Sequence, residues 1–434
     1  MNTNPPPAPA GAAPDFPDAQ ASDPATLGWM AGTPPPPERV IRYDDGSFLR
    51  FPMWRWSFSH WRELVPTVNV PRGPAATCTL PRAERADLDA VRFTPLGSTQ
   101  QMTWEQSLAA NYTDGIVVLH GGRIVYERYF GALSAERPHI AFSVTKSFFG
   151  TIAATLAAEG ALDPAARVSR YLPELAGSGF GDATVAQVLD MTTALRHTEA
   201  YGDPASDFAD YARATGLVPH GPAYAGARTT YAYLATVAKA GEHGPAFAYR
   251  SINTDVVGWL VARVAGAPPH EVLRQRIWSL LGAEDDAHLQ VDSAGTPLVA
   301  VALNARLRDL ARFGEMLRLD GWFNGRQIVP ASVVADLRRG GSRDAFARAG
   351  YPTLPGWSYR SQWWLSHNEH GAFMARGIHG QAIYVDPAAA MVIARFASHP
   401  LASNVNLDPT SLPAYHALAR HLLAQPDSAP RRFA

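Results

Sequence analysis

Ser143 and Lys146 lie three residues apart at the start of a stretch with helical periodicity. Apolar residues recur every three to four positions across residues 145–158, and no proline interrupts them. Serine is favoured at a helix N-terminus, and residues three apart share one helix face. The lysine amine can therefore lie beside the serine hydroxyl, which is how a nucleophile is paired with its base. The N–H groups of the helix start could also stabilise an oxyanion.

The choice of lysine at this position strengthens the interpretation. Among the 38 Lys and Arg residues, only Lys146 and Lys239 are lysine. Arginine keeps its proton in proteins, whereas a desolvated lysine can become neutral and basic. Taken alone, this stretch also fits a solvated helix charge next to a capping serine.

A second segment with chemical potential is Tyr249 followed by Ser251, directly before a predicted helix. We expect Asn253 or Thr254 to cap that helix. A phenol near a lysine ammonium can be held as an anion or can relay protons. The alternative is a packed tyrosine beside a capping asparagine.

A third segment, residues 376–381, reads Arg-Gly-Ile-His-Gly-Gln and leads into a predicted strand. Its glycines would let an edge strand lie close to a substrate and offer it backbone N–H groups. His379 also suggests a Ser-His-Asp triad. We rank the triad second because Lys146 already provides a base for Ser143.

The remaining pattern predicts strands at both ends of the chain and helices between them. Residues 115–119 and 123–129 flank a His-Gly-Gly turn and predict a hairpin, and residues 382–386 and 391–396 predict two late strands. Helices are expected at residues 185–192, 229–239, 254–264, 271–281, 303–319 and 414–423. This order predicts an antiparallel sheet built from both chain ends, with a helical region inserted.

The domain organisation follows from the same pattern. Residues 1–38 are rich in proline and alanine, so we expect them to be disordered. Residues 39–434 should form one domain, with the sheet from about 39–140 and 360–434 and a helical subdomain at about 160–345. The aromatic residues within 41–70 should form a cap on the main body, or a platform at a substrate entrance.

Composition excludes several classes of function. The net charge of -1 over 434 residues gives no attraction to nucleic acid or to anionic membranes. Cys78 is the single cysteine, and no apolar run reaches the roughly 18 residues that cross a bilayer. The first residues do not form a secretory signal, so we expect a soluble, cytoplasmic protein, with a homodimer as one option.

Metal and cofactor sites are not expected. His367, Glu369 and His370 lie close in sequence, but no partner set with ligand spacing accompanies them, which favours a solvated loop. No nucleotide-binding fingerprint occurs between a strand and a helix. The predicted partner is a small molecule.

Ser-x-x-Lys, Tyr-x-Ser and a Gly-rich strand start, in this order, resemble the serine β-lactamase and penicillin-binding-protein superfamily, class C branch. The chain is most similar to the 6-aminohexanoate-dimer hydrolases within it. The likeness runs from about Trp54 to the C-terminus. The matching stretches are residues 57–66, 143–150, 172–178, 187–191, 203–206, 253–256, 308–312, 362–364 and 378–381.

The resemblance implies a role for each matching position. Ser143 would be the acylated nucleophile, Lys146 would accept its proton, and Tyr249 would pass that proton to the leaving group. The N–H groups of Ser143 and Ile378 would form the oxyanion hole, and Tyr201 would contact the substrate from a closing loop. Ser251 and His379 would complete the lining of the site.

The resemblance also implies a fold and an activity. The fold would be α/β (α+β), β-lactamase/DD-peptidase-like, with an antiparallel sheet flanked by helices and an all-helical subdomain. The activity would be hydrolysis of amide or ester bonds in small linear substrates. The alternatives are a carboxylesterase, a weak β-lactamase or a D-aminopeptidase, and beyond these a non-catalytic binder of peptide-like ligands.

Three departures from the family pattern bear on the substrate. Ala212 stands where efficient dimer hydrolases carry an acid that pairs with the substrate amine, and Asp210 lies two residues away. Ala300 replaces a second polar position on the substrate side. The third segment lacks the Lys-Thr-Gly of β-lactamases. Hydrolysis of simple carboxylic esters needs none of these contacts.

Overall fold

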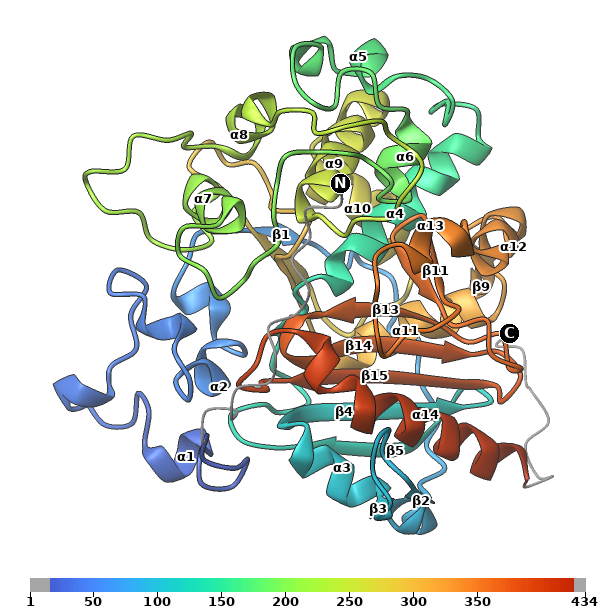
Figure 1. Ribbon diagram of the computed structural model, residues 1–434. Helices are drawn as coiled ribbons and strands as arrows, with labels where there is room; N and C mark the ends of the chain where they lie inside the picture. Colours follow the sequence, from blue (N-terminus) through green and yellow to red (C-terminus); the bar gives the residue numbers. More distant parts are fainter. Residues whose placement is uncertain (1–15, 425–434) are drawn as a thin grey trace.

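A seven-stranded antiparallel sheet built from both ends of the chain forms the centre of the protein (Figure 1). The computed structural model describes residues 16–424. The strand order is β11-β12-β13-β14-β15-β4-β5. In that order the strands are Ser358–Arg360, Trp363–Leu365, Phe373–Gly377, Gln381–Asp386, Met391–Ala397, Thr113–His120 and Arg123–Tyr129. The predicted hairpin is therefore β4 and β5, and the two late strands are β14 and β15.

Helices cover both faces of this sheet, so its central strands are buried on both sides. Val117 and Leu119 of β4 belong to one apolar core, whereas Ile116 and Val118 belong to another, as the two-residue period of a strand requires. The first core includes residues of α4 (Val144–Ala158) and α11 (Leu307–Arg318). The second includes residues of α3 (Trp104–Ala110) and α14 (Asp408–Leu423), which lie in front of the sheet in Figure 1.

A smaller antiparallel sheet joins this layer to the helical region. Its strands, in the order β1-β7-β8-β6, are Thr67–Val70, Ala287–Gln290, Leu303–Ala305 and His139–Ile140. Two of them, β7 and β8, lie within residues 160–345. We predicted a helical subdomain for that section, and the structure therefore adds strands to it. The helix expected at 303–319 starts only at Leu307, because the preceding residues pair with β7 and β6.

Helices, most of them short, make up the inserted region in the upper half of Figure 1. They are α5 (Val168–Tyr171), α6 (Val185–Leu189), α7 (Asp207–Ala214), α8 (Thr230–Thr236), α9 (Ser251–Ala265), α10 (Pro269–Leu273), α12 (Ala331–Arg339) and α13 (Arg343–Ala347). The two-stranded pairs are β2 (Arg92–Phe93) with β3 (Met102–Thr103) and β9 (Trp322–Phe323) with β10 (Arg326–Gln327). Among residues 16–424, none of the helices combines the length and apolar character that crossing a bilayer requires.

The N-terminal segment is more ordered than its composition predicts. Residues 16–38 include α1 (Pro24–Leu27), which Asp23 caps by accepting from two N–H groups. The buried Arg55, in α2 (Trp54–Ser57), donates to Ser22 at 2.9 Å and to Ser398 at 3.1 Å. The prediction of disorder for residues 1–38 is therefore wrong for 16–38, because distant polar partners hold the segment. Residues 1–15 lie outside the described residues.

Candidate active site

Ser143 lies at the N-terminus of α4, at a sharp turn between β6 and the helix. Phe142 adopts a positive φ of 42°, which is uncommon for a residue with a side chain. Its ring is buried against Phe58, with ring centroids 4.9 Å apart. This packing fixes the turn, so Ser143 takes the N-cap position directly before Val144 and remains 6% exposed. Strained backbone of this kind is often found at functional sites.

Lys146 lies one turn further along α4 and points back toward Ser143. Its Nζ donates to Ser143 Oγ at 3.0 Å, to Ser251 Oγ at 3.1 Å and to the carbonyl oxygen of Ala300 at 2.6 Å. The side chain is 1% exposed. By contrast Lys239, the other lysine, is partly exposed and pairs with Asp182. The predicted proximity of hydroxyl and amine is therefore present in the structure.

Burial makes Lys146 unusually acidic for a lysine. Desolvation lowers its pKa to about 8, although the charges of Glu199 and Asp255 oppose the change. At pH 7 about one molecule in ten then carries a neutral amine at this position. That population can accept a proton from a neighbouring hydroxyl.

Tyr249 reaches the same point from the loop that precedes α9. Lys146 Nζ lies 5.3 Å from the centroid of its ring, and Tyr249 and Ser143 line the same cavity. Burial raises the pKa of Tyr249 well above its usual value, although the polar interaction with Ser143 opposes the change. The phenol is therefore neutral at pH 7. Of the two states considered from the sequence, the anion is wrong and a neutral proton donor fits.

Ser251 connects Lys146 to a buried carboxylate that sequence reasoning missed. Its backbone N–H donates to Glu199 Oε1, and its hydroxyl lies 3.3 Å from Glu199 Oε2. Burial alone would raise the pKa of Glu199, but hydrogen bonding and charge from His197, together with Lys146, bring it below its usual value. Glu199 is therefore ionised next to the lysine.

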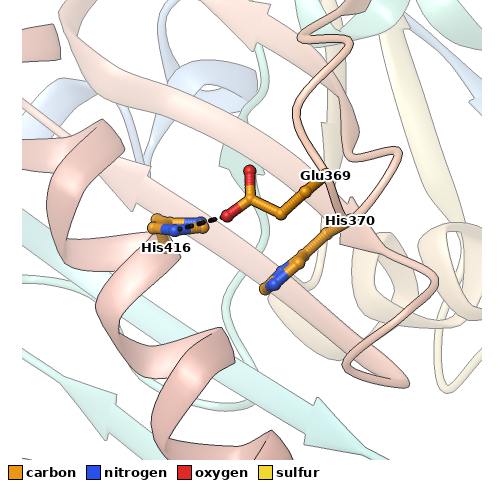
Figure 2. A group of neighbouring side chains, drawn as sticks. All are labelled: Glu369, His370 and His416. Atoms are coloured by element: carbon orange, nitrogen blue, oxygen red, sulfur yellow. Dashed lines mark ion pairs between the residues drawn. The ribbon is translucent and has the colours of Figure 1, made fainter.

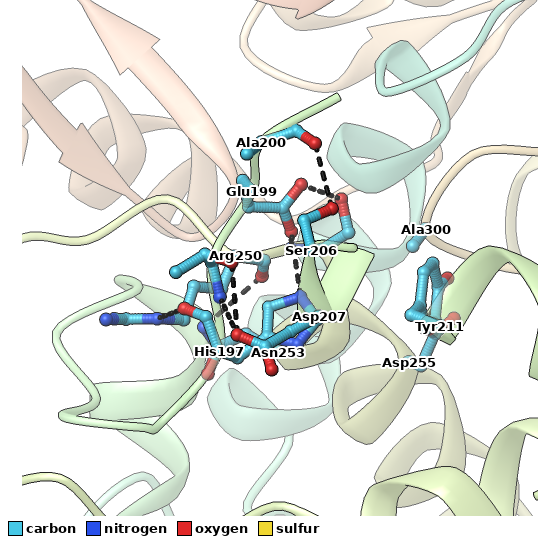
Figure 3. A network of polar contacts seen from close by, with 12 residues as sticks. His197, Glu199, Ala200, Ser206, Asp207, Tyr211, Arg250, Asn253, Asp255 and Ala300 are labelled. Atoms are coloured by element: carbon cyan, nitrogen blue, oxygen red, sulfur yellow. Dashed lines mark hydrogen bonds and ion pairs between the residues drawn. The ribbon is translucent and has the colours of Figure 1, made fainter. Parts of the chain in front are cut away.

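Asp255 is the second carboxylate near Lys146, one turn along α9 from Ser251. Burial raises its pKa to about 7, although a hydrogen bond from Tyr211 at 2.7 Å and the Lys146 charge oppose the change. Figure 3 shows Tyr211 and Asp255 side by side near Ala300. The predicted caps Asn253 and Thr254 lie inside α9, because the helix begins at Ser251 and not after it.

The end of β13 lies against the start of α4 because Gly377 has no side chain. A Cβ at Gly377 would stand 2.8 Å from the carbonyl oxygen of Ala141 and 3.1 Å from the backbone N of Ser143. Only glycine permits this approach without displacing the backbone. Ile378 follows at once and lines the same cavity as Ser143. Both residues therefore border one space.

His379 does not have the contacts of a triad histidine. Its Nδ1 hydrogen bonds with the carbonyl oxygen of His399 at 2.7 Å, where a triad would place a carboxylate. Burial lowers its pKa to about 4. Its ring packs against Trp54 and Phe58, with centroids 4.7 and 5.2 Å away. The Ser-His-Asp alternative is therefore wrong, although His379 lines the neighbouring chamber.

Two adjoining chambers open in front of Ser143. The first has a volume of about 110 Å³ and is lined by Ser143, Tyr201, Tyr249, Tyr351, Trp364, Arg376, Ile378, Ser403, Asn404, Val405 and Asp408. Arg376 and Asp408 form a buried ion pair in this wall. The guanidinium also lies 5.1 Å from the Trp364 ring centroid. Its charge is thus already neutralised by a protein carboxylate.

The second chamber is larger and mostly apolar. It has a volume of about 750 Å³ and shares Tyr201, Tyr249 and Ile378 with the first. Its apolar lining residues are Leu49, Trp54, Phe142, Phe208, Ala212, Leu217, Val218, Pro400 and Leu401. Leu49 and Trp54 belong to the N-terminal aromatic segment, which therefore both caps the body and lines the entrance. An uncharged chain would be well accommodated here.

The substrate-side positions named from the sequence are only partly in this chamber. Ala212 is buried in its wall. Asp210 is not among the lining residues, and its exposed carboxylate pairs with Arg213 at 2.7 Å. Ala300 contributes its carbonyl oxygen to Lys146, so its part in the site comes from the backbone.

Neither Glu199 nor the pairing of Arg376 with Asp408 was predicted from the sequence. Glu199 lies in a loop without periodicity and meets Ser251 across 52 residues of chain. Its position two residues before Tyr201 is the one hint available. A single sequence does not reveal such long-range pairings, because nothing local requires them.

Comparisons with known proteins agree with this geometry. A family model described as beta-lactamase matches residues 105–410. The chain is 36% identical to a 6-aminohexanoate-dimer hydrolase from Paenarthrobacter ureafaciens over 355 residues, which cover 82% of this chain and 88% of that protein. The predicted fold class is confirmed.

Solved structures extend the similarity. A Bacillus anthracis protein assigned as a 6-aminohexanoate-dimer hydrolase superposes with a TM-score of 0.81 and 31% identity, covering 91% of this chain and all of that one. A family VIII carboxylesterase gives a TM-score of 0.55 at 19% identity, covering 73% and 96% of the two chains. The second comparison shows a shared fold alone.

Proposed function

Because the chain belongs to the beta-lactamase family, and within it to the group of the 6-aminohexanoate-dimer hydrolases, we propose that it hydrolyses uncharged esters and amides through an acyl-enzyme on Ser143. The chain is a serine hydrolase of this superfamily. The observation that carries the proposal is the buried Lys146 amine, 3.0 Å from the Ser143 hydroxyl.

In the proposed acylation, neutral Lys146 takes the proton of Ser143 while Oγ attacks the substrate carbonyl carbon. The N–H groups of Ser143 and Ile378 stabilise the oxyanion, and such a donor is typically worth about 3 kcal/mol. Tyr249 donates its phenolic proton to the leaving alkoxide or amine and regains one from the Lys146 ammonium. Water then attacks the acyl ester by the reverse proton path, releasing the acid and restoring Ser143.

The proposed substrate preference rests on charge in the two chambers. Ala212 offers no carboxylate to a substrate amine, and the Glu199 carboxylate in the same wall is already bound by Ser251. Arg376 is held by Asp408 and so is not free for a substrate carboxylate. The apolar wall instead favours an uncharged, medium-length acyl chain. Esters of such acids should be better substrates than the zwitterionic aminohexanoate dimer or a penicillin. The similarity to a 6-aminohexanoate-dimer hydrolase supports amide cleavage as the second activity.

A substrate panel tests this proposal. We expect p-nitrophenyl hexanoate to give a higher kcat/KM than p-nitrophenyl acetate, the aminohexanoate dimer or a cephalosporin. Ser143→Ala should abolish all of these activities while the thermal unfolding curve stays cooperative. Undiminished ester turnover by Ser143→Ala would show that another residue is the nucleophile. A preference for the dimer would refute the proposed specificity alone.

A cytoplasmic location, a homodimeric state and the lack of a nucleic-acid partner remain predictions. The single cysteine and the net charge of -1 support the first and the last. Cell fractionation and light scattering during size-exclusion chromatography test the location and the assembly.

A further inference from the structure

Glu369, His370 and His416 meet where the loop between β12 and β13 passes α14 (Figure 2). One donor atom of each lies within 4.8 Å of the others. Glu369 Oε1 is 3.3 Å from His416 Nε2, and the two imidazole centroids are 5.0 Å apart. The sequence suggested only a solvated loop here, because His416 is distant in the chain. His367 is not part of the group, since it binds Ser358 at 2.7 Å.

The orientation of His370 is fixed from behind by a buried carboxylate. Its Nδ1 lies 2.8 Å from Asp386 Oδ2, and the Asp386 side chain is 0% exposed. The other Asp386 oxygen accepts the N–H of Ala389 at 2.9 Å. Since the carboxylate is an acceptor, Nδ1 carries a proton, so Nε2 is the ring nitrogen that can bind a metal ion. Metal-binding histidines are commonly held by such a carboxylate.

The charges around the group suit a cation bound by nitrogen and oxygen. Glu369 faces His416 at 3.3 Å and offers its carboxylate oxygens to the same point as the two imidazoles. Arg420, further along α14, is the nearby charge that opposes cation binding. Two imidazoles and one carboxylate are a frequent set for Zn²⁺, which binds them at about 2.0–2.2 Å. Glu369 is 68% exposed and can turn to close that distance.

We propose that Glu369, His370 and His416 form a binding site for Zn²⁺ or a similar borderline metal ion. Water completes the coordination. The ion ties the loop before β13 to the middle of α14. The strand that follows this loop, β13, is already joined to the N-terminal end of α14 by the pair of Arg376 and Asp408, which line the Ser143 chamber. A bound ion therefore stabilises the wall of that chamber from outside it and takes no part in the reaction.

Calorimetric titration of the full chain tests the site directly. The protein is prepared without a polyhistidine tag and treated with a chelator before Zn²⁺ is added. We expect one ion per chain, and His416→Ala should weaken binding at least tenfold. Asp386→Asn should weaken it by about 10- to 100-fold, as loss of such a supporting carboxylate does. His421→Ala, on the same helix but paired with Asp87, is the matched control and should bind like wild type.

Two further readouts make the result unambiguous. Zn²⁺ should raise the unfolding temperature of wild type and His421→Ala but not of His416→Ala, which also shows that each variant is folded. Mg²⁺ and Ca²⁺ should not compete, because both prefer all-oxygen sites. Absence of saturable Zn²⁺ binding to wild type overturns the proposal. So does wild-type affinity in a folded His416→Ala.

Discussion

Glu199→Gln tests the electrostatic control of Lys146, because it removes a charge and keeps the side-chain shape. Ser251 Oγ lies 3.1 Å from Lys146 Nζ and 3.3 Å from Glu199 Oε2. The amine and the carboxylate oxygen are therefore at most about 6.4 Å apart. At an effective dielectric of about 20, opposite charges at that distance attract by roughly 2.6 kcal/mol. A carboxylate stabilises the ammonium, so its loss lowers the Lys146 pKa, by about 1 to 2 units.

The assay is the pH dependence of kcat/KM for a p-nitrophenyl ester. In wild type, kcat/KM should increase with pH along a limb whose midpoint lies near pH 8, because acylation needs the neutral amine and the Lys146 pKa is about 8. In Glu199→Gln the limb should move to lower pH, toward about 6 to 7. Asp210→Asn, which alters an exposed carboxylate of α7, is the control and should leave the limb in place.

The direction of this change is what refutes the reasoning. A limb that stays near pH 8 in Glu199→Gln would mean that Glu199 does not act on the amine. A limb that moves upward would contradict the reasoning outright, because loss of a negative charge lowers the pKa of any neighbouring titrating group. A loss of activity at every pH, without a change in the limb, would indicate a purely structural role.

Three further predictions follow from single contacts. Unfolded lysine titrates near 10.5 and Lys146 at about 8, so the folded state binds fewer protons between these values. In urea unfolding, the free energy of unfolding of wild type should therefore rise by about 2 to 3 kcal/mol relative to that of Lys146→Met as the pH rises through that window. The absence of any relative rise would contradict the lowered pKa of Lys146. Gly377→Ala places a methyl group 2.8 Å from the Ala141 carbonyl oxygen and 3.1 Å from Ser143 N, so the backbone must shift, kcat should fall by up to about 10²-fold and the unfolding temperature should fall as well; an unchanged kcat would argue against an oxyanion hole there. Ala212→Asp adds a carboxylate to the apolar chamber and should raise activity on the aminohexanoate dimer relative to a neutral ester by about tenfold; an unchanged ratio would show that this wall does not select substrates.

Local features of the fold and the site were predictable because their causes are local. The alternation of residues 115–129 around a glycine turn gave the hairpin, and the three-residue spacing gave the contact between Ser143 and Lys146. The residues before α9 made Tyr249 a candidate, but its role beside Ser143 came from the family resemblance, since its approach to Ser143 depends on how α9 packs on α4. Its neutral state followed only from burial, which the sequence does not give.

Features that depend on distant pairing were missed. Leu303–Ala305 pairs with two other strands in the structure, yet by periodicity it reads as the first turn of α11. Residues 16–38 have the composition of a disordered segment, but Arg55 donates a hydrogen bond to Ser22 within it and another to the distant Ser398. His416 joins Glu369 and His370 only because α14 crosses the loop before β13.

Intact-mass spectrometry during turnover of a slow ester tests the central claim most directly. Wild-type protein quenched with acid should carry one added acyl group, and peptide mapping should locate it on Ser143. Ser143→Ala, incubated in the same way, should keep its original mass. An acyl group on another residue of wild type, or on the alanine variant, would contradict the account.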